Sequence, residues 1–196
     1  IRQNKLEEKN LKRKQKAIFL DRDGTINEHV GFLKRADEFR LLPGTAEAIR
    51  LMNEKNYLVI VVTNQPVVAR GETTVEELER IHRKMETLLG KEGAYVDAVY
   101  FCPHHPDKGY PGEVSEFKTE CSCRKPKAGM LLNAAQKYNI DLRKSWMAGD
   151  SIIDIQAGKA AGCYTAGIYG CQGENGTFAT LLDFAEFLCG ECERKD

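Results

Sequence analysis

The sequence predicts an α/β fold: a Rossmann-like parallel sheet flanked by helices, without a large cap domain. From residue 17 onward, short apolar runs alternate with amphipathic helical stretches, the pattern of a parallel sheet covered on both faces. Polar residues follow several of these runs, where ligand sites gather in such sheets. One segment, 102–128, interrupts the alternation and is rich in Pro, Gly, Cys and His.

The apolar runs predict five strands, and the stretches between them predict five helices. The helix that begins near residue 74 has Thr73 or Thr74 as its cap, and glutamates in its first turn complement the helix N-terminus. The strands are "AIFLD", "YLVIVVTN", "VDAVYFC", "SWMAGD" and "CYTAGIY", and the helices are 44–56, 74–90, 129–139, 152–161 and 178–188.

Length and composition favour one ordinary domain. The 196 residues are 42% hydrophobic, and 29 Lys and Arg balance 29 Asp and Glu. The zero net charge argues against binding a polyanion through bulk charge, so no nucleic-acid partner is expected. No apolar run approaches the roughly 20 residues of a membrane span, and no secretory signal is visible. We therefore expect a cytoplasmic protein with no membrane partner.

Residues 1–16 form a separate basic segment. Seven Lys and Arg stand against two Glu there, a net charge of +5, and no aromatic residue is interleaved. This composition predicts a solvated arm or linker before a domain that spans residues 17–196. The first residue is Ile1, which favours a processed or excised segment.

Acidic and polar residues follow three of the predicted strands. The spacing of Asp21 and Asp23 on extended chain places both side chains on one side, and Gly24 permits a tight turn after them. Two close carboxylates repel each other, and a divalent cation relieves that repulsion. Such an edge suits Mg²⁺-dependent phosphoryl transfer to an aspartyl nucleophile. The other candidates at this edge are Thr63, Asn64, Asp150, Asp154, and Lys125 or Lys127.

Four motifs resemble one family. "LDRDGTIN", "VVTNQ", "CRKP" and "MAGDSIIDIQAG" resemble the haloacid dehalogenase superfamily of phosphohydrolases. More narrowly, they are similar to the D-glycero-D-manno-heptose 1,7-bisphosphate phosphatases and the related histidinol-phosphate phosphatase domains. The resemblance covers about residues 16–170.

The resemblance implies a role for each catalytic residue. Asp21 attacks phosphorus, and Asp23 first protonates the leaving alkoxide and then activates water. Mg²⁺ is held by the Asp21 side chain, the Asp23 backbone carbonyl and Asp150. Thr63 and Lys125 bind the phosphoryl oxygens. The lysine after the "CxCR" arginine is the family's lysine, so Lys125 is preferred to Lys127 as the catalytic residue.

Substrate-binding residues are expected around these groups. The interval between Asp23 and Thr63 is too short for a free-standing cap of about 40 residues or more, so the loop 27–33 and segment 102–128 are the available lids. Two departures from the family pattern are Pro66-Val67 in place of Ser-Gly and Ser151 in place of a lysine. The expected substrate-binding residues are Asn64, Gln65, Arg124, His29 and Phe32.

The cysteines divide into a cluster and a remainder. Cys102 and His104 precede Cys121 and Cys123 by a 16-residue gap. This donor set suits a closed tetrahedral zinc site, and a cluster of free thiols is the alternative. The resemblance implies zinc, which would clip the long segment and position Arg124 and Lys125.

The remaining cysteines and the second histidine are expected to stay outside that cluster. His105 is expected at the surface or beside substrate rather than as a fifth ligand. Cys163 and Cys171 are expected to be core or loop thiols. Cys189 and Cys192 are expected to be free thiols, with a second metal or a redox pair as the alternative.

The predicted function is Mg²⁺-dependent removal of the 7-phosphate of D-glycero-D-manno-heptose 1,7-bisphosphate. Histidinol phosphate or another small sugar phosphate is the alternative substrate. In a signalling receiver domain the phosphoacceptor lies on a later strand than the acidic pair. Here Asp21 and Asp23 both follow the first strand, so this alternative is disfavoured. A zinc-stabilised binding domain without catalysis is disfavoured by the intact acidic residues. Some similar proteins are fused to a sugar nucleotidyltransferase. If this chain comes from such a fusion, residues 1–16 are the remnant of the linker between the two domains.

Overall fold

A six-stranded parallel sheet forms the centre of the molecule. The computed structural model describes residues 14–193. The strands are β1 (Ala17–Leu20), β2 (Leu58–Asn64), β3 (Ala98–Cys102), β4 (Trp146–Gly149), β5 (Tyr164–Ile168) and β6 (Gly176–Phe178), in the spatial order β3-β2-β1-β4-β5-β6. Every neighbouring pair is parallel. The predicted fold class is therefore confirmed.

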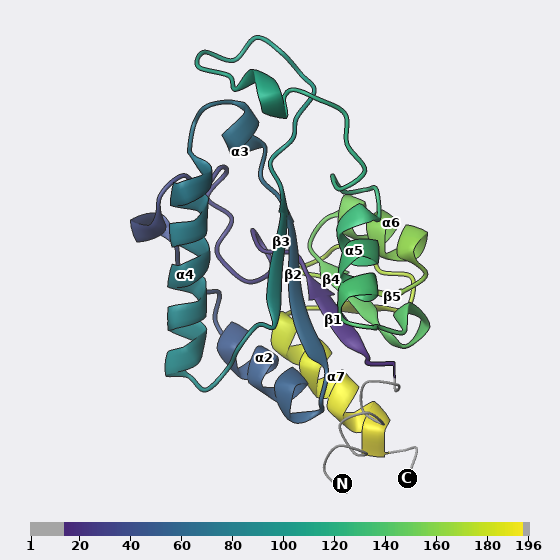
Figure 1. Ribbon diagram of the computed structural model, residues 1–196. Coiled ribbons are helices and arrows are strands. Elements are labelled where there is room, and N and C mark those ends of the chain that lie inside the picture. Colours follow the sequence, from purple (N-terminus) through teal and green to yellow (C-terminus); the bar gives the residue numbers. More distant parts are fainter. Residues whose placement is uncertain (1–13, 194–196) are drawn as a thin grey trace, which may run out of the picture.

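Helices cover both faces of the sheet (Figure 1). On one face lie α2 (Thr45–Glu54), α4 (Val75–Lys91) and α7 (Leu181–Glu193), and on the other lie α5 (Gly129–Lys137) and α6 (Ile152–Ala161). Shorter elements are α3 (Pro66–Ala69), η1 (Ala36–Glu38), η2 (Ser115–Phe117) and η3 (Leu142–Lys144). Between β1 and β2 the chain holds only η1 and α2, so there is no large cap domain in this interval.

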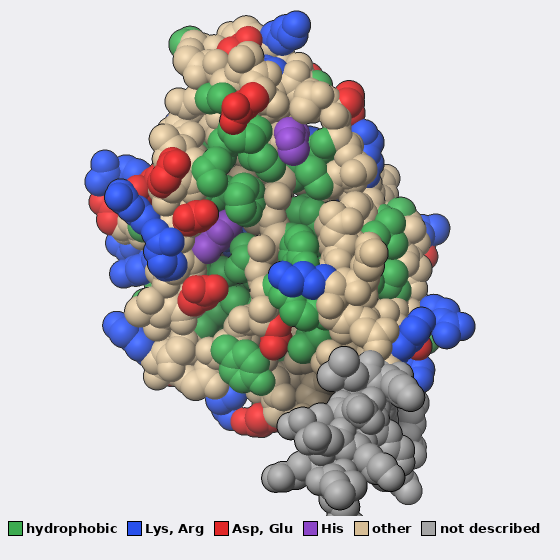
Figure 2. Space-filling view, in the orientation of Figure 1, with side chains coloured by type: hydrophobic (Ala, Val, Ile, Leu, Met, Phe, Trp, Pro, Cys, Tyr) green, Lys and Arg blue, Asp and Glu red, His purple; other side chains and the backbone are tan. Residues whose placement is uncertain are grey.

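The alternation of side chains along β1 builds two hydrophobic cores. Ile18 and Leu20 belong to the core beneath α2, α4 and α7, whereas Ala17 and Phe19 belong to the core beneath α5 and α6. All four side chains are buried, because a central strand of a two-sided sheet has no solvent-facing side. Figure 2 shows hydrophobic side chains along the middle of one face, with most Lys and Arg side chains toward its edges and some charged side chains among the hydrophobic ones.

Most predicted elements are present, and their ends differ by a few residues. The five predicted strands correspond to β1 to β5, and β6 is an additional one. The predicted helix 178–188 begins instead at Leu181, because Phe178 pairs with Ile168 as the last residue of β6. The predicted helix 129–139 ends at Lys137, and Asn139 has a positive φ of 51°.

Pro66, one of the departures from the family pattern, begins the short helix α3. A proline fits this first helical position, where its missing N–H costs nothing.

The predicted basic arm lies mostly outside the described residues, which begin at residue 14. Gln15 already contacts the domain, because its backbone exchanges hydrogen bonds with Asn139 and Asp141. None of the helices in the described part of the chain combines the length and apolar character that crossing a membrane requires.

Strand register brings the site together. Leu20 at the end of β1 lies opposite Val61 of β2 and Ala148 of β4. The residues that follow these strands therefore emerge at the same edge of the sheet. The Asp, Thr and Asn residues that the sequence singles out lie at the end of β2 or directly after β1 and β4.

Candidate active site

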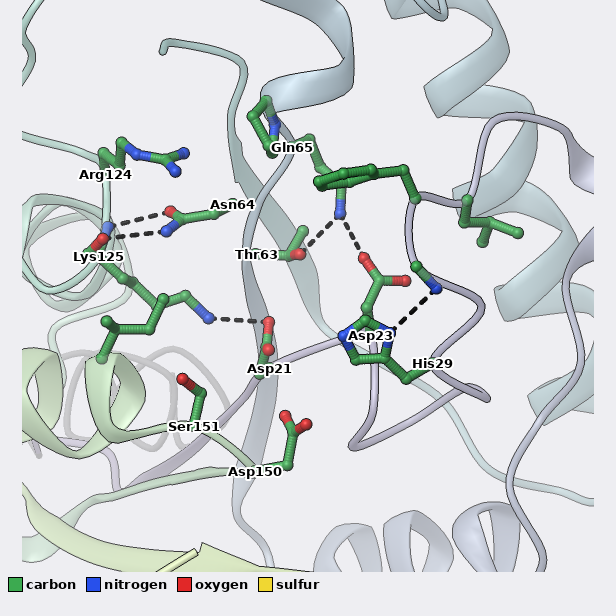
Figure 3. A pocket seen from close by; sticks show the side chains of 15 residues that line it. Asp21, Asp23, His29, Thr63, Asn64, Gln65, Arg124, Lys125, Asp150 and Ser151 are labelled. Atoms are coloured by element: carbon green, nitrogen blue, oxygen red, sulfur yellow. Dashed lines mark hydrogen bonds and ion pairs between the residues drawn. The ribbon is translucent and has the colours of Figure 1, made fainter. Parts of the chain in front are cut away.

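One cavity of about 460 Å³ collects the predicted catalytic and substrate-binding residues at this edge (Figure 3). Asp21 and Asp23 project into it from the loop after β1, and Thr63 projects from β2. The predicted residues that line the cavity are Asp21, Asp23, His29, Phe32, Thr63, Asn64, Gln65, Arg124, Lys125 and Asp150. Topology thus places together groups that the chain separates by up to 129 positions.

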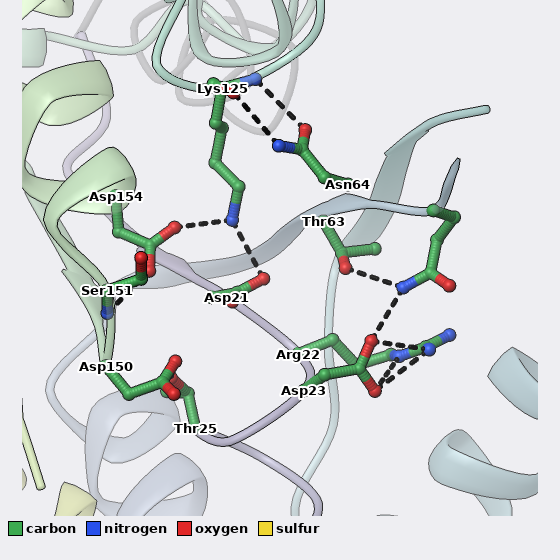
Figure 4. A network of polar contacts seen from close by, with 11 residues as sticks. Asp21, Arg22, Asp23, Thr25, Thr63, Asn64, Lys125, Asp150, Ser151 and Asp154 are labelled. Carbon is green, nitrogen blue, oxygen red and sulfur yellow. Dashed lines mark hydrogen bonds and ion pairs between the residues drawn. The ribbon is translucent and has the colours of Figure 1, made fainter. Parts of the chain in front are cut away.

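A buried lysine bridges two carboxylates at one side of the cavity. The Lys125 Nζ lies 2.8 Å from Asp21 Oδ1 and 2.6 Å from Asp154 Oδ1 (Figure 4). Burial disfavours the charged amine, but the two carboxylates outweigh it and raise the pKa of Lys125. Burial also raises the pKa of Asp154, in spite of Lys125. Asp21 therefore faces the cavity beside a fixed positive charge.

Asp150 lies across the cavity from Lys125 and accepts a hydrogen bond from Thr25 Oγ1 at 3.2 Å. Burial and the negative charge of Asp21 raise the pKa of Asp150. Gly24 has a φ of +86°, and a Cβ there would overlap the Asp150 carboxylate. The turn after Asp23 therefore requires glycine, both for its conformation and for the close approach of Asp150.

The donor atoms of Asp21, Asp150 and Asp154 all lie within 4.8 Å of one another. Three carboxylates at this separation repel each other, and hard oxygen donors of this kind suit Mg²⁺. Asp21 and Asp150 are the two side chains expected to hold Mg²⁺, and Asp154 lies with them as a third carboxylate.

Asp23 is held by hydrogen-bond donors on several sides. Arg22 donates from Nη2 to both carboxylate oxygens, at 3.0 and 2.8 Å, and from Nε at 3.2 Å. Asn27 Nδ2 and Gln65 Nε2 donate at 3.0 and 2.8 Å. Burial opposes ionisation, but the Arg22 charge and these hydrogen bonds outweigh it and lower the pKa of Asp23. The resting residue is a carboxylate and is ready to act as a base.

The polar residues that follow β2 position other groups of the site. Gln65 Nε2 donates to Thr63 Oγ1 as well as to Asp23, and so links the two. Asn64 exchanges two hydrogen bonds of 3.0 Å with the backbone of Lys125. The side chain of Asn64 therefore anchors the backbone of Lys125.

Three of the expected substrate-binding residues, His29, Phe32 and Arg124, line the cavity from the loop 27–33 and from segment 102–128, whereas Asn64 and Gln65 are engaged with Lys125, Thr63 and Asp23. His29 Nδ1 accepts a hydrogen bond from the backbone N–H of Gly31 in the loop 27–33. Phe32 is 48% exposed, and its ring stacks on the guanidinium of Arg70. Arg124 donates to the backbone carbonyl of His104, at 3.3 Å. The loop 27–33 and segment 102–128 thus each contribute side chains to the lining of the cavity.

The four residues predicted to bind zinc come together. The Sγ atoms of Cys102, Cys121 and Cys123 lie 3.2 to 3.5 Å apart. The Nδ1 atom of His104 lies 3.6 Å from the Cys102 sulfur and 3.4 Å from the Cys123 sulfur. Zinc–sulfur bonds of about 2.3 Å in a tetrahedron place sulfurs about 3.8 Å apart, so these donors fit a closed zinc site.

His105 is not at the surface, contrary to one of the two expected placements. It is 8% exposed, its ring packs edge-on against Tyr110, and its Nε2 lies 3.4 Å from Arg70. The four-donor cluster does not include it. Lys127, the alternative catalytic lysine, is exposed and pairs with Glu120, outside the cavity.

The other departures have local explanations. Ser151, where the family often has lysine, forms a capping box with Asp154 at the start of α6.

The described cysteines outside the four-donor cluster lie apart from the cavity. Cys163 packs against the core beneath α5 and α6. Cys163, Cys171 and Cys189 are free thiols, and the side chain of Cys192 lies outside the described residues.

Two contacts of the site were not expected from the sequence. Arg22 is fully buried behind Asp23 and also contacts His82 of α4. Asp154 closes the ion pair with Lys125. A polar residue between two catalytic aspartates was the available signal for Arg22, but nothing in the spacing connected it with His82, which is 60 positions away.

A cavity carboxylate beside a buried lysine, a second carboxylate across from it and a third held by an arginine are the groups that phosphoryl transfer through an aspartyl nucleophile would use on an α/β fold. The comparison with protein families agrees with this class. The haloacid dehalogenase-like hydrolase family matches residues 3–162, and the chain belongs to this family.

Two relatives and one solved structure make the likeness more specific. The D-glycero-beta-D-manno-heptose-1,7-bisphosphate 7-phosphatases of Yersinia pestis and Escherichia coli K12 are 45% and 42% identical over 145 residues. The match covers 74% of this chain and 75% and 74% of those proteins. The crystal structure of D,D-heptose 1,7-bisphosphate phosphatase from B. bronchiseptica, complexed with magnesium and phosphate, is 35% identical. It has a TM-score of 0.79 and covers 90% of this chain and 99% of that one.

Proposed function

We propose that the protein is a Mg²⁺-dependent phosphatase that removes the 7-phosphate of D-glycero-D-manno-heptose 1,7-bisphosphate. The observation that carries this proposal is the position of Asp21. Its carboxylate faces the cavity between Lys125 and Asp150, with Asp23 on a neighbouring wall. The relatives named for this substrate support the choice of sugar.

The first half-reaction transfers the phosphoryl group to Asp21. An Oδ atom of Asp21 bonds to phosphorus as the bond from phosphorus to the sugar oxygen breaks. Asp23, a carboxylate at rest, takes up a proton from solvent as the phosphate binds and gives it to the leaving alkoxide. The negative charge of the bound phosphate disfavours the ionised form of Asp23 and so raises its affinity for that proton. Lys125 and Thr63 stabilise the phosphoryl oxygens as charge shifts.

The second half-reaction releases phosphate. Asp23, now a carboxylate again, takes a proton from a water molecule, and the water oxygen attacks the aspartyl phosphate. Gln65 and Asn27 hold Asp23 in place for this step, since each donates a hydrogen bond to one of its carboxylate oxygens. The same residue thus serves as acid and then as base.

Asp21 and Asp150, with the backbone carbonyl of Asp23, would hold Mg²⁺. When bound, the ion offsets the negative charge of the carboxylates and of the phosphate. Asp154 lies within reach of the same cluster. We assign it mainly to Lys125, because its carboxylate already accepts from that amine and from the Ser151 backbone.

Zinc is proposed at Cys102, His104, Cys121 and Cys123, as a structural ion. Four protein ligands leave no open position for catalysis. Arg124 and Lys125 directly follow the last ligand, so the ion would fix the start of the segment that carries both residues. Thiolate ligands of this kind persist in a reducing compartment, which supports the cytoplasm as the location.

The distal group of the substrate is proposed to meet Arg124, with His29 and Phe32 at the rim. A guanidinium binds a phosphate with two parallel hydrogen bonds. A phosphorylated sugar is therefore the proposed small-molecule partner. Residues 17–196 are proposed as the phosphatase domain, with the basic segment 1–16 outside it.

The proposal is tested by hydrolysis of a substrate panel in the presence of Mg²⁺. The panel holds both anomers of the heptose 1,7-bisphosphate, its 1-phosphate, and histidinol phosphate. We expect the highest kcat/KM with one of the bisphosphate anomers and release of the 7-phosphate alone. A higher kcat/KM with histidinol phosphate would replace the proposed substrate with the alternative. The Asp21→Asn variant is the control for contaminating phosphatases.

A further inference from the structure

Arg22 connects the active site with helix α4. Its side chain is fully buried, and it extends behind Asp23 rather than into the cavity (Figure 4). One side of the guanidinium donates to both oxygens of Asp23. On the other side, Nη1 lies 3.2 Å from Nε2 of His82. The guanidinium therefore joins a catalytic carboxylate to a residue that does not line the cavity.

His82 accepts the hydrogen bond in this contact. An arginine has only donors, so Nε2 must carry the lone pair and Nδ1 the proton of a neutral ring. Burial and the charge of Arg22 lower the pKa of His82 to about 3, which agrees with a neutral ring. The ring is only 7% exposed and packs against Phe101 at a centroid distance of 5.7 Å. The acceptor is therefore fixed in place.

This contact determines how the guanidinium faces Asp23. Arg22 is fully buried, and a buried N–H that loses its acceptor is unfavourable. Asn27 and Gln65 each hold one oxygen of Asp23, whereas Arg22 holds both. The plane of the guanidinium therefore sets the plane of the carboxylate.

We propose that His82 is a positioning residue for proton transfer by Asp23, acting through Arg22. The proposal rests on the phosphatase chemistry proposed above, but not on the identity of the sugar. The step it affects is the transfer of a proton from Asp23 to the leaving oxygen as the bond between phosphorus and that oxygen breaks. The electron pair of that bond stays on the oxygen, which the proton then neutralises.

Leaving groups differ in how much they need this proton. A sugar alkoxide is a strong base and leaves slowly without protonation, whereas p-nitrophenolate is a stable anion and leaves readily. The constant kcat/KM covers the steps up to the formation of the aspartyl phosphate. A loss of positioning at Asp23 should therefore reduce kcat/KM for a sugar phosphate much more than for p-nitrophenyl phosphate.

The test compares His82→Leu, which keeps the side-chain volume but removes the acceptor, with His82→Gln, which supplies an amide oxygen. For His82→Leu we expect kcat/KM for the heptose bisphosphate to fall about tenfold or more, part of the 10²–10⁴ that general acid catalysis contributes. For p-nitrophenyl phosphate we expect a fall of about threefold or less. His82→Gln should recover most of the loss. Met85→Leu, a buried substitution on the same helix, is the matched control.

Three results would overturn the proposal: no loss with His82→Leu, an equal loss with both substrates, or a His82→Gln variant as impaired as His82→Leu. Misfolding is detected separately, by binding of beryllofluoride to Asp21 in the presence of Mg²⁺, followed by fluorine NMR. If the wild-type enzyme does not cleave the heptose bisphosphate, the sugar assignment fails. The same comparison is then made with whichever alkyl phosphate of the panel it cleaves.

Discussion

Substitution of Lys125 by methionine separates the structural role of this lysine from its catalytic role. The Lys125 side chain is 1% exposed and lies between Asp21 and Asp154, at 2.8 and 2.6 Å. Methionine keeps the length of the side chain and removes the charge. Asp21 then faces the cavity and water, but Asp154 has a fully buried side chain and loses its cation.

The expected cost follows from this buried carboxylate. Breaking a buried ion pair by removing one partner typically costs about 3–5 kcal/mol in the free energy of unfolding. For a domain of this size, that corresponds to a Tm about 6–20 °C lower. Asp154→Asn in the Lys125→Met background removes the unpaired charge and keeps an acceptor for the Ser151 N–H. The double variant should therefore recover more than about 2 kcal/mol, in line with the coupling of neighbouring groups.

Urea unfolding followed by circular dichroism measures the free energies, and phosphate release measures kcat. Because Lys125 is proposed to stabilise the transferring phosphoryl group, kcat should fall about 10²–10³-fold in both variants. Stability would thus return in the double variant without activity. A Lys125→Met protein within about 1 kcal/mol of the wild type, or a double variant no more stable than the single one, would refute the reasoning.

Three other predictions concern single residues. Asp21→Asn should abolish turnover, because an amide does not attack phosphorus, and unchanged activity would refute its role as the nucleophile. Cys123→Ser should reduce the bound zinc measured by atomic absorption and lower the Tm, whereas Cys163→Ser should retain zinc; a full zinc content in Cys123→Ser would contradict the assigned ligands. Arg124→Ala should raise KM for the bisphosphate about tenfold or more and change KM for p-nitrophenyl phosphate little, and equal effects on both substrates would exclude contact with the distal group.

The sequence predicted the parts of the site that depend on local order along the chain. Asp21 and Asp23 follow a buried strand, and Asp150 follows another, so parallel pairing alone brings their strand ends to one edge. The strands themselves were evident because each is a continuous apolar run. The exception is β6, whose residues "GTF" carry no such signal; its pairing with β5 depends on neighbours that only the folded chain supplies.

The contacts that the sequence did not predict are those between elements. Whether Arg22 points into the cavity or behind Asp23 depends on the acceptor that α4 places there, and the register of α4 against the sheet is a tertiary property. The same holds for Asp154, since its distance from Lys125 depends on how the segment after Cys123 approaches α6. A motif predicts that such residues belong to the site, but the side chains that they contact depend on how the helices pack against the sheet.

The charges of the site favour the binding of a divalent cation. Two buried basic side chains already form ion pairs: Arg22 pairs with Asp23, and Lys125 pairs with Asp21 and Asp154. No cation of the described residues forms an ion pair with Asp150, whose side-chain donor is the Thr25 hydroxyl. The substrate then adds a phosphate to this side of the cavity. The negative charge that remains is therefore concentrated between Asp21 and Asp150, where Mg²⁺ would offset it, while Arg22 holds the carboxylate of Asp23 apart from these two, as its proposed role in proton transfer requires.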